Sequence, residues 1–278
     1  MVFMPEEKKY RLAARAANPK GTVVKVKGLE IGSKKIVVMA GPCAVESEQQ
    51  LLEAALAVKK AGASVLRASA FKPRTSPYGF QGLGEKGLKL IKKVSSEAGL
   101  VSETEPVDTR HVKLVSGYVD ILRVGARNMT NFELLKEVGK SGKPVILKNG
   151  ISSTAEEFLL AAEYILKEGN RNVILCYRGT KGFEPATRFA LDISIVPWLK
   201  RETHLPVIVD PSHGSGNSGL VPQVSMAAIA AGSDGLMVEV HPKPERALSD
   251  SAQQLTPAQF SRLMLGLGPV AKSVGRVF

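Results

Sequence analysis

The stretch PVILKNGISSTAEEFLLAAEYILKEG, residues 144–169, contains one complete strand and helix unit. Residues 144–150 form a short run rich in branched apolar side chains, which is typical of a buried strand. The segment that follows starts with serine and threonine, continues with early glutamates and ends at a glycine, which are the start and stop signals of a helix. We therefore predict a strand followed by a helix, the repeating unit of a parallel α/β fold.

The same unit recurs along the chain, because short β-branched runs alternate with longer amphipathic segments. The strand-like runs cover residues 35–41, 64–70, 100–104, 120–126, 144–150, 172–179, 206–214 and 235–241. The last helix-like segment, residues 256–274, fills the chain almost to its end. Eight units match a single (β/α)8 barrel, the TIM barrel, better than a doubly wound sheet of fewer strands.

Three segments divide the chain without a linker or a break in composition. Residues 1–21 form a polar N-terminal segment, and residues 22–35, TVVKVKGLEIGSKK, predict a short β-hairpin that caps the barrel floor. Residues 36–278 make the barrel itself. We therefore expect a single domain, and the 44% hydrophobic content is enough to give it a sizeable core.

The composition limits the classes of partner and substrate that the protein could bind. The net charge of +12 is compatible with a nucleic-acid surface, an acidic membrane or small anionic substrates. Many lysines lie in mixed helical stretches typical of solvated helix faces, and no apolar run is long enough to span a bilayer. Because no secretory signal is visible, we expect a cytoplasmic protein with reduced thiols at Cys43 and Cys176.

Cations gather where a barrel holds its catalytic groups, at the carboxyl ends of the strands. Five of them follow or end strand-like runs: Arg67, Lys72, Arg127, Lys148 and Arg178. Residues 66–82, LRASAFKPRTSPYGFQG, add Arg74 beside the hydroxyls of Thr75 and Ser76, with almost no carboxylate nearby. Unpaired cations repel one another, so this rim predicts substrates that carry phosphate and carboxylate groups.

A second set of side chains at the same rim is suited to a metal ion. Cys43, His213, Glu239 and Asp250 combine a thiol, an imidazole and carboxylates, a donor set that favours Mn, Fe, Co or Zn over magnesium. His241 ends the same strand as Glu239, so either could be the ligand on period-two geometry. We expect Cys176, in the middle of a strand, to be a buried hydrophobe, and His111 and His204 to face solvent.

Seven motifs, in order along the chain, resemble those of a known enzyme family. They are AGPCAVES, LRASAFKPRTSPYGFQG, RVGARNMTN, ILKNG, CYRG, DPSHGSG and MVEVHPKPERALSDSAQQL. Together they resemble the 3-deoxy-D-arabino-heptulosonate-7-phosphate (DAHP) synthases of the type I beta group over roughly residues 20 to 275. The resemblance implies a transferase of the shikimate pathway and of aromatic amino acid biosynthesis. Such an enzyme condenses phosphoenolpyruvate with erythrose 4-phosphate, using a divalent metal ion.

The resemblance also implies roles for individual residues. It gives the metal ion, manganese being one candidate, to Cys43, His213, Glu239 and Asp250. It gives phosphoenolpyruvate to Arg67, Lys72, Arg127, Lys148, Arg178 and the backbone near Ala126, and it also counts His213 among the substrate-binding residues. It gives erythrose 4-phosphate to Pro73, Arg74, Thr75 and Ser76. Among the catalytic candidates Lys72, Glu103 and His213, we expect Lys72 to donate a proton to the new hydroxyl and Glu103 to position the water.

Two rival functions remain to be weighed. The 3-deoxy-D-manno-octulosonate-8-phosphate synthases share the barrel and phosphoenolpyruvate but take arabinose 5-phosphate. They typically carry KANRSS where this chain has KPRTS, and they lack the GARNM segment found here. A non-catalytic polyanion binder, for example of RNA, is disfavoured because only 5% of residues are aromatic and no basic motif is recognised. We therefore expect small-molecule substrates, no nucleic acid and no membrane.

Assembly and regulation are further expectations. We expect a homo-oligomer, either a homotetramer or a dimer. About 34 residues precede the barrel, too few for the regulatory domain of on the order of 50 residues that relatives often carry. The sequence therefore predicts a feedback-insensitive enzyme whose rate does not change with phenylalanine, tyrosine or tryptophan.

Overall fold

The predicted barrel is confirmed in a computed structural model of the chain, which describes residues 9–278. Eight parallel strands close in the order β10-β3-β4-β5-β6-β7-β8-β9. The strands are β3 (Val37–Gly41), β4 (Val65–Arg67), β5 (Val101–Thr104), β6 (Ile121–Val124), β7 (Val145–Lys148), β8 (Val173–Tyr177), β9 (Val207–Val209) and β10 (Gly235–Glu239). Each falls inside one of the eight runs that the sequence predicted.

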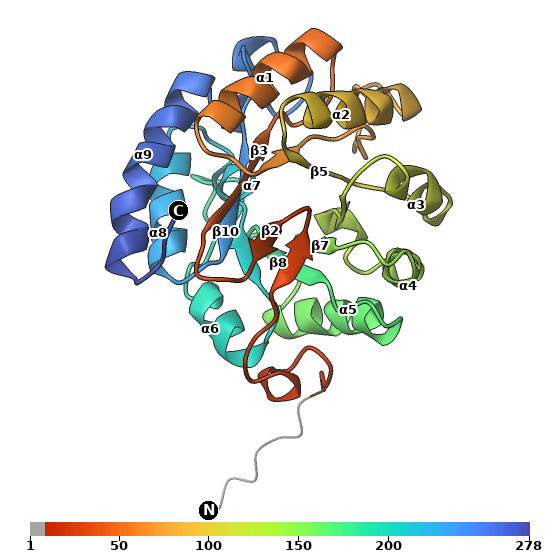
Figure 1. Cartoon of the computed structure of the whole chain (residues 1–278), viewed down its shortest axis with the longest axis vertical. Coiled ribbons are helices and arrows are strands. Elements are labelled where there is room, and N and C mark those ends of the chain that lie inside the picture. The colour runs from red at the N-terminus through yellow and green to blue at the C-terminus, as the bar shows by residue number, and fades with distance from the viewer. Residues whose placement is uncertain (1–8) are drawn as a thin grey trace, which may run out of the picture.

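Helices surround the strands on the outside of the barrel (Figure 1). They are α1 (Glu48–Lys60), α2 (Glu85–Glu97), α3 (Thr109–Ser116), α4 (Phe132–Lys140), α5 (Ala155–Lys167), α6 (Ile195–Glu202), α7 (Pro211–Ser215), α8 (Val221–Ala230) and α9 (Pro257–Ser273). Single 3-10 turns are η1 (Arg15–Ala17), η2 (Ala126–Asn128), η3 (Pro244–Arg246) and η4 (Ser251–Gln253). Helix α5 starts where the sequence predicted it, at a capping box between Thr154 and Glu157. No helix among residues 9–278 has the length and apolar character needed to cross a membrane.

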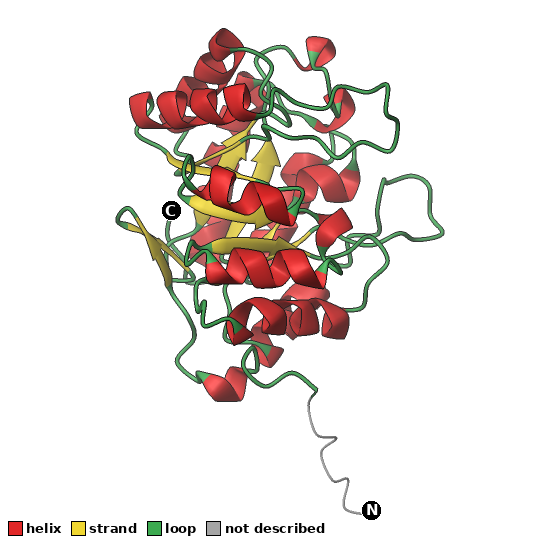
Figure 2. Ribbon diagram, turned by 90° about the vertical axis from the view of Figure 1, so that its right-hand side faces the viewer, coloured by secondary structure: helices red, strands yellow, loops and turns green. Residues whose placement is uncertain are grey.

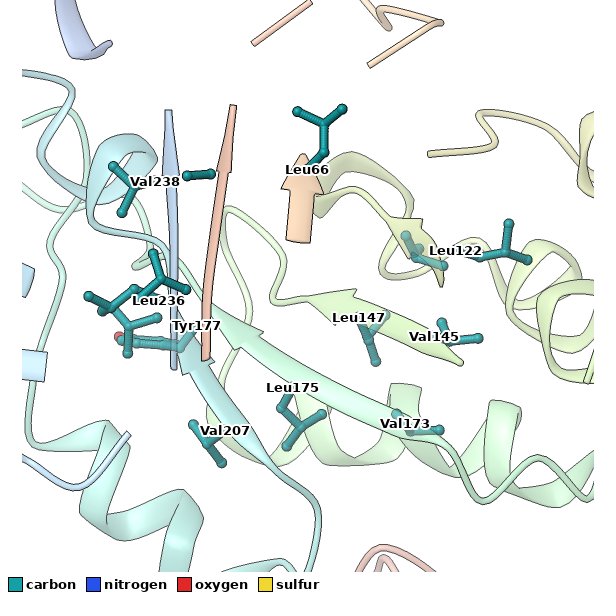
Figure 3. Packing of buried hydrophobic residues seen from close by; sticks show 14 of the residues in the cluster. Leu66, Leu122, Val145, Leu147, Val173, Leu175, Tyr177, Val207, Leu236 and Val238 are labelled. Carbon is teal, nitrogen blue, oxygen red and sulfur yellow. The ribbon is translucent and has the colours of Figure 1, made fainter. Parts of the chain in front are cut away.

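An apolar layer joins the strands to these helices. Leu66, Leu122 and Leu147 point outward from their strands (Figure 3) and belong to one cluster of buried residues with Leu134 of α4 and Phe158 of α5. Alternate residues of the same strands point inward instead, because successive strand side chains face opposite sides of the sheet. The barrel interior therefore has its own set of side chains, separate from this layer.

The predicted hairpin is present and closes the barrel floor. Strands β1 (Val24–Val26) and β2 (Leu29–Ile31) pair antiparallel, and Lys27 and Gly28 both have positive φ, as a tight two-residue turn requires. Apolar side chains of both strands pack with the innermost residues of the barrel strands. Figure 2 shows the hairpin at one end of the barrel, opposite the end with the long loops. The divisions at residues 21 and 35 stay predictions, and residues 1–8 of the polar segment lie outside the described residues.

The described part of the N-terminal segment packs against the barrel. The backbone N–H of Ala13 donates to Glu163 at 2.6 Å, and Thr203 donates to the carbonyl of Ala13 at 2.5 Å. The expectation that His204 faces solvent is wrong, because its ring is hydrogen-bonded to Thr22 and to the carbonyl of Leu12. The histidine is consequently only 5% exposed. His111 is half-buried and stacks on Phe71, with ring centroids 4.7 Å apart.

Along the barrel axis the inward side chains change from apolar to charged. At the floor they include Val65, Val101, Ile121, Ile146, Ile208 and Met237. Two residues later along the same strands, or just past the end of β9 in the case of Asp210, stand Arg67, Glu103, Arg123, Lys148, Asp210 and Glu239, all buried. The strand period of two carries each pair on one face. The barrel therefore has an apolar floor and a charged mouth, and the mouth is where the functional residues lie.

Candidate active site

The mouth contains a cavity of about 520 Å³. Its lining includes every predicted substrate-binding residue: Arg67, Lys72, Pro73, Arg74, Thr75, Ser76, Ala126, Arg127, Lys148, Arg178 and His213. These residues come from loops or strand ends spread over much of the chain, and the closed barrel brings them together. Asp250, one of the predicted metal ligands, also faces the cavity, together with Glu105, Arg123, Lys181 and Arg188, which the sequence analysis did not select.

Arg178 is a buried cation without an ion pair among residues 9–278. The side chain is 3% exposed and its guanidinium lies 3.4 Å from the ring centroid of Phe189. One of its nitrogens, Nε, has no hydrogen-bond partner, and Nη1 makes only a long contact of 3.4 Å to the carbonyl of Gly179. Burial lowers the pKa of Arg178 to about 10, which leaves the group charged at neutral pH. An anion in the cavity would satisfy it.

Lys148 and His213 share a carboxylate that the sequence analysis missed, Asp210. The Lys148 ammonium pairs with Asp210, and Nδ1 of His213 lies 2.8 Å from the same oxygen. Burial opposes ionisation of Asp210, yet His213 and Lys148 hold its pKa well below the usual range. Burial lowers the pKa of His213, although Asp210 acts in the opposite direction. Asp210 thus fixes the imidazole orientation and directs Nε2 toward Glu239, 3.6 Å away.

Three of the predicted metal ligands meet at one point. The sulfur of Cys43 and one carboxylate oxygen each of Glu239 and Asp250 lie within 4.8 Å of one another. His213 is outside that group of three but next to Glu239. Oε1 of Glu239 is buried and lies 3.0 Å from Nη1 of Arg67, so this carboxylate is ion-paired with Arg67 as well as next to His213. Thiol, imidazole and carboxylate together fit a divalent transition ion, so these four residues form a candidate metal site.

His241 is not in that group of three, whereas Glu239 is. Strand β10 ends at Glu239, so the period of two no longer applies two residues later. The His241 ring instead accepts a hydrogen bond from the backbone N–H of Lys243 at 3.0 Å. Its Nε2 lies 3.4 Å from a carboxylate oxygen of Glu46.

Lys72 connects the cavity to the candidate metal site. Its ammonium lies 2.9 Å from the sulfur of Cys43. Burial first, and then the charge of Glu239, raise the pKa of the Cys43 thiol to about 12, while Lys72 lowers it. Binding a metal ion would therefore release the thiol proton. Cys176, in contrast, is completely buried in the inner apolar cluster, which confirms the prediction of a buried hydrophobe, and both cysteines are free.

Glu103 is not part of the cavity lining. It is completely buried beneath it, where Arg123 Nε donates to its carboxylate at 2.8 Å. The same arginine lies 3.3 Å from Glu105, which does face the cavity. Burial raises the pKa of Glu105, but Arg123, Lys72 and Lys148 lower it more, so the net shift is downward. Glu105 therefore faces the cavity, whereas Glu103 does not.

The loop that follows β4 forms one wall of the cavity. Arg74, Thr75 and Ser76 lie together on it with no ion pair among the described residues. The backbone N–H of Lys72 donates to the carbonyl of Gln81 at 2.9 Å and closes the loop. At the next residue, Gly82, φ is +93°, and a Cβ would lie 2.2 Å from the Ala70 carbonyl oxygen, so only glycine fits. This wall therefore presents one cation and two hydroxyls to the cavity.

Comparisons with known proteins agree with this geometry. A family model described as the DAHP synthetase I family matches residues 18–272. The phospho-2-dehydro-3-deoxyheptonate aldolase of Thermotoga maritima is 47% identical over 268 residues, which is 96% of this chain and 79% of the relative. The 2-dehydro-3-deoxyphosphooctonate aldolase of Koribacter versatilis is 31% identical, over 83% of this chain and 89% of the relative.

Solved structures are similar throughout the fold. A crystal structure of the Thermotoga maritima aldolase, a DAHP synthase, superposes with a TM-score of 0.95 at 46% identity, covering 98% of this chain and 80% of the other. A truncated form of 3-deoxy-D-arabino-heptulosonate 7-phosphate synthase from the same organism gives a TM-score of 0.90 at 42% identity, covering 96% and 98%. Sequence, fold and cavity thus lead to one conclusion: this chain belongs to the DAHP synthetase I family.

Proposed function

We propose that this chain condenses phosphoenolpyruvate with erythrose 4-phosphate and water to give 3-deoxy-D-arabino-heptulosonate 7-phosphate and phosphate. The observation that carries the proposal is the unpaired, buried Arg178 at one end of a cavity whose other wall holds Arg74. Two separate cationic positions suit two anionic substrates. Membership of the DAHP synthetase I family and the similarity to the Thermotoga maritima enzyme support the same reaction.

Phosphoenolpyruvate would occupy the inner part of the cavity. Its carboxylate and phosphate would be held by Arg67, Lys72, Ala126, Arg127, Lys148, Arg178 and His213. Erythrose 4-phosphate would lie toward the loop, with its phosphate against Arg74, Thr75 and Ser76, while Pro73 restricts the backbone of that loop. This arrangement brings C3 of phosphoenolpyruvate next to the aldehyde carbon, so the cavity acts first by orientation.

Cys43, His213, Glu239 and Asp250 would hold one divalent ion, of Mn, Fe, Co or Zn. When bound, that ion supplies Lewis-acid polarisation of the aldehyde oxygen. Lys72 lies between this site and the cavity, and we assign it the proton that goes to the new hydroxyl. Its donation removes the negative charge that forms on that oxygen as the carbon–carbon bond is made.

The second half of the reaction adds water to C2 of the former phosphoenolpyruvate. This carbon becomes cation-like once C3 has bonded to the aldehyde. We assign the water to Glu105, whose lowered pKa keeps the carboxylate ionised and able to accept a hydrogen bond. Loss of the phosphate group then leaves the keto sugar, while Arg178 and Lys148 hold the departing anion. The predicted role of Glu103 is thereby transferred to Glu105, its neighbour two residues along.

The alternative substrate is arabinose 5-phosphate, because a relative at 31% identity carries the octulosonate name. Purified, metal-stripped protein assayed with phosphoenolpyruvate and each sugar phosphate separates the two functions when Mn, Fe, Co and Zn are added back singly. Metal-dependent phosphate release with erythrose 4-phosphate, and at least tenfold less with arabinose 5-phosphate, is the expected result. Preference for the five-carbon sugar, or activity that never depends on metal, would contradict the proposal.

Assembly, location and regulation are proposed together with the reaction. We propose a cytoplasmic homo-oligomer, a tetramer or a dimer, as expected from the sequence. The rate of this chain should not change with millimolar phenylalanine, tyrosine or tryptophan, because every helix and strand described between residues 9 and 278 belongs to the barrel, its hairpin or the N-terminal segment. A steady-state assay with each amino acid tests this, and strong inhibition by any of them would contradict it.

A further inference from the structure

Two buried glutamines follow Asp250 on the segment that lies over the candidate metal site. Gln253 ends η4 and Gln254 follows it, and each is 2% exposed. The segment is tied to β10, because the backbone N–H of Leu255 donates to the carbonyl of Glu239 at 2.9 Å. A buried amide must find partners for both its N–H groups and its oxygen. The contacts of these side chains therefore show what the segment is built to hold.

Gln253 touches one metal-site carboxylate directly and another through an arginine. Its Nε2 donates to Oε2 of Glu239 at 2.6 Å. Its Oε1 accepts from Nη1 of Arg188 at 2.8 Å, and the same Nη1 donates to Oδ1 of Asp250 at 3.1 Å. Since one end of the amide faces a carboxylate and the other a guanidinium, only one orientation of the amide satisfies both.

Each of the two carboxylates is thus held at one oxygen by a side chain that is not a candidate metal ligand. Glu239 has Oε2 occupied by Gln253, while Oε1 lies 3.0 Å from Nη1 of Arg67 and 3.6 Å from Nε2 of His213. Asp250 has Oδ1 occupied by Arg188, while Oδ2 lies 3.1 Å from the sulfur of Cys43. The second oxygen of each side chain lies next to another candidate ligand, Oε1 of Glu239 beside His213 and Oδ2 of Asp250 beside Cys43. Gln254 adds a third support, because its Oε1 accepts the backbone N–H of Cys43 at 3.0 Å.

We propose that Gln253 is a positioning residue of the metal site. By holding Oε2, its amide orients the Glu239 carboxylate so that Oε1 lies beside His213, and through Arg188 it keeps Oδ2 of Asp250 beside Cys43. Groups that orient metal ligands in this way contribute strongly to affinity although they never touch the ion. The inference rests on the metal site of the proposed function and adds to it a residue that fixes two ligands at once.

The test is a calorimetric titration of the metal-stripped full chain with Mn²⁺. Gln253→Met removes both hydrogen bonds at similar volume, and we expect it to weaken Mn²⁺ binding about 10 to 100-fold. Gln223→Met, on the exposed face of α8, is the matched control and should bind as the unmodified chain does. Arg188→Met changes a partly exposed side chain and should weaken binding less than Gln253→Met. It also keeps the test valid if the buried variant does not fold.

A spectroscopic readout separates positioning from general damage. In the Co²⁺-loaded Gln253→Met protein, the thiolate-to-cobalt band should persist because Cys43 still binds, while the ligand-field bands change with the carboxylate geometry. A variant that unfolds more easily yet binds Mn²⁺ within twofold of the unmodified chain, with unchanged cobalt bands, would show a merely structural role and overturn the inference. If the unmodified chain binds no Mn²⁺, the proposed metal site itself fails, and this inference fails with it.

Discussion

The two ends of this barrel are built from the same strands, yet they are stabilised in opposite ways. On β4, Val65 packs at the floor and Arg67 stands two residues above it; on β6, Ile121 and Arg123 repeat the pattern. The floor is held by apolar burial, which is non-directional and tolerates small changes in shape. The mouth is held mainly by paired buried charges, which are strongly destabilised when one partner is removed. Along the barrel axis, the floor therefore serves mainly stability and the mouth carries the chemistry.

The largest expected effect comes from breaking the mouth network. Arg123→Met leaves Glu103 without its hydrogen-bonded cation, and it also removes the ion pair to Glu105. A buried carboxylate that loses its partner costs about 3 to 5 kcal/mol. Urea unfolding should show a loss of that size. The double variant Arg123→Met/Glu103→Met should recover most of it, whereas equal losses in both variants would mean that the charges are not coupled.

At the floor, a change of side-chain volume should affect stability and leave the chemistry alone. Ile31 is completely buried between the hairpin and the barrel strands, so Ile31→Ala should cost about 2 to 3 kcal/mol through lost burial and a cavity. Glu30→Ala, on the exposed face of the same strand, is the control. We expect kcat and both KM values of folded Ile31→Ala to match those of the unmodified enzyme. A changed KM would show that the ends communicate.

Removing the unpaired cation Arg178 from the mouth should affect the chemistry and leave stability alone. Arg178→Met should raise KM for phosphoenolpyruvate by about 10 to 100-fold, which corresponds to a charge-assisted contact of about 1.5 to 3 kcal/mol. KM for erythrose 4-phosphate should change much less, because its phosphate would lie on the opposite wall. Arg262→Met, an exposed cation on α9, is the matched control. Equal effects on the two substrates would show that the anion sites are wrongly assigned.

The smallest effect concerns a charge at the floor, where Lys27 of the hairpin pairs with Asp120 at 2.8 Å. Burial raises the pKa of Asp120, but Lys27 and Ser102 lower it more, so the folded pKa lies below the unfolded one. Such a group stabilises the fold above the unfolded pKa, and this contribution is lost as the pH falls through the folded pKa.

Asp120→Asn should accordingly cost about 1 kcal/mol at pH 7. The difference between Asp120→Asn and the unmodified chain should shrink as the pH is lowered from 5 toward 3, measured as urea midpoints. A difference that stays constant over that range would mean that the hydrogen bonds to Ser102, rather than the charge, hold the carboxylate.

Sequence periodicity was sufficient for the barrel because each strand run has a sharp turn signal after it. The position of a residue at a strand end then predicted its place at the mouth, as for Lys148 and Arg178. Arg123 and Asp210 were missed because they lie inside runs that read as uniform strand, and the inward register needs a known neighbour before it can be counted. The burial of Glu103 outside the cavity lining was missed for the same reason, because its partner Arg123 lies on the neighbouring strand, twenty positions away along the chain.

Other features depend on contacts between distant segments, which no local pattern contains. His204 sits in a polar stretch, and its burial follows only from the N-terminal residues that cover it. The contact of the Gln253 amide with Glu239 likewise cannot be predicted until η4 is known to lie over that residue. In each case the local residues were read correctly, but their partners lie more than ten positions away along the chain.

The hairpin that closes the barrel floor affects how the protein folds during synthesis on the ribosome. Val24, Val26 and Ile31 emerge early, but Ile208 and Met237, with which they pack, are among the last core residues to be synthesised. The barrel closes only when β10 pairs with β3, so the nascent chain carries an uncovered apolar surface through most of translation. A ribosomal pause before β9 would prolong the exposure of this apolar surface. A pause after β10 would not, because the chain could then already bury the surface.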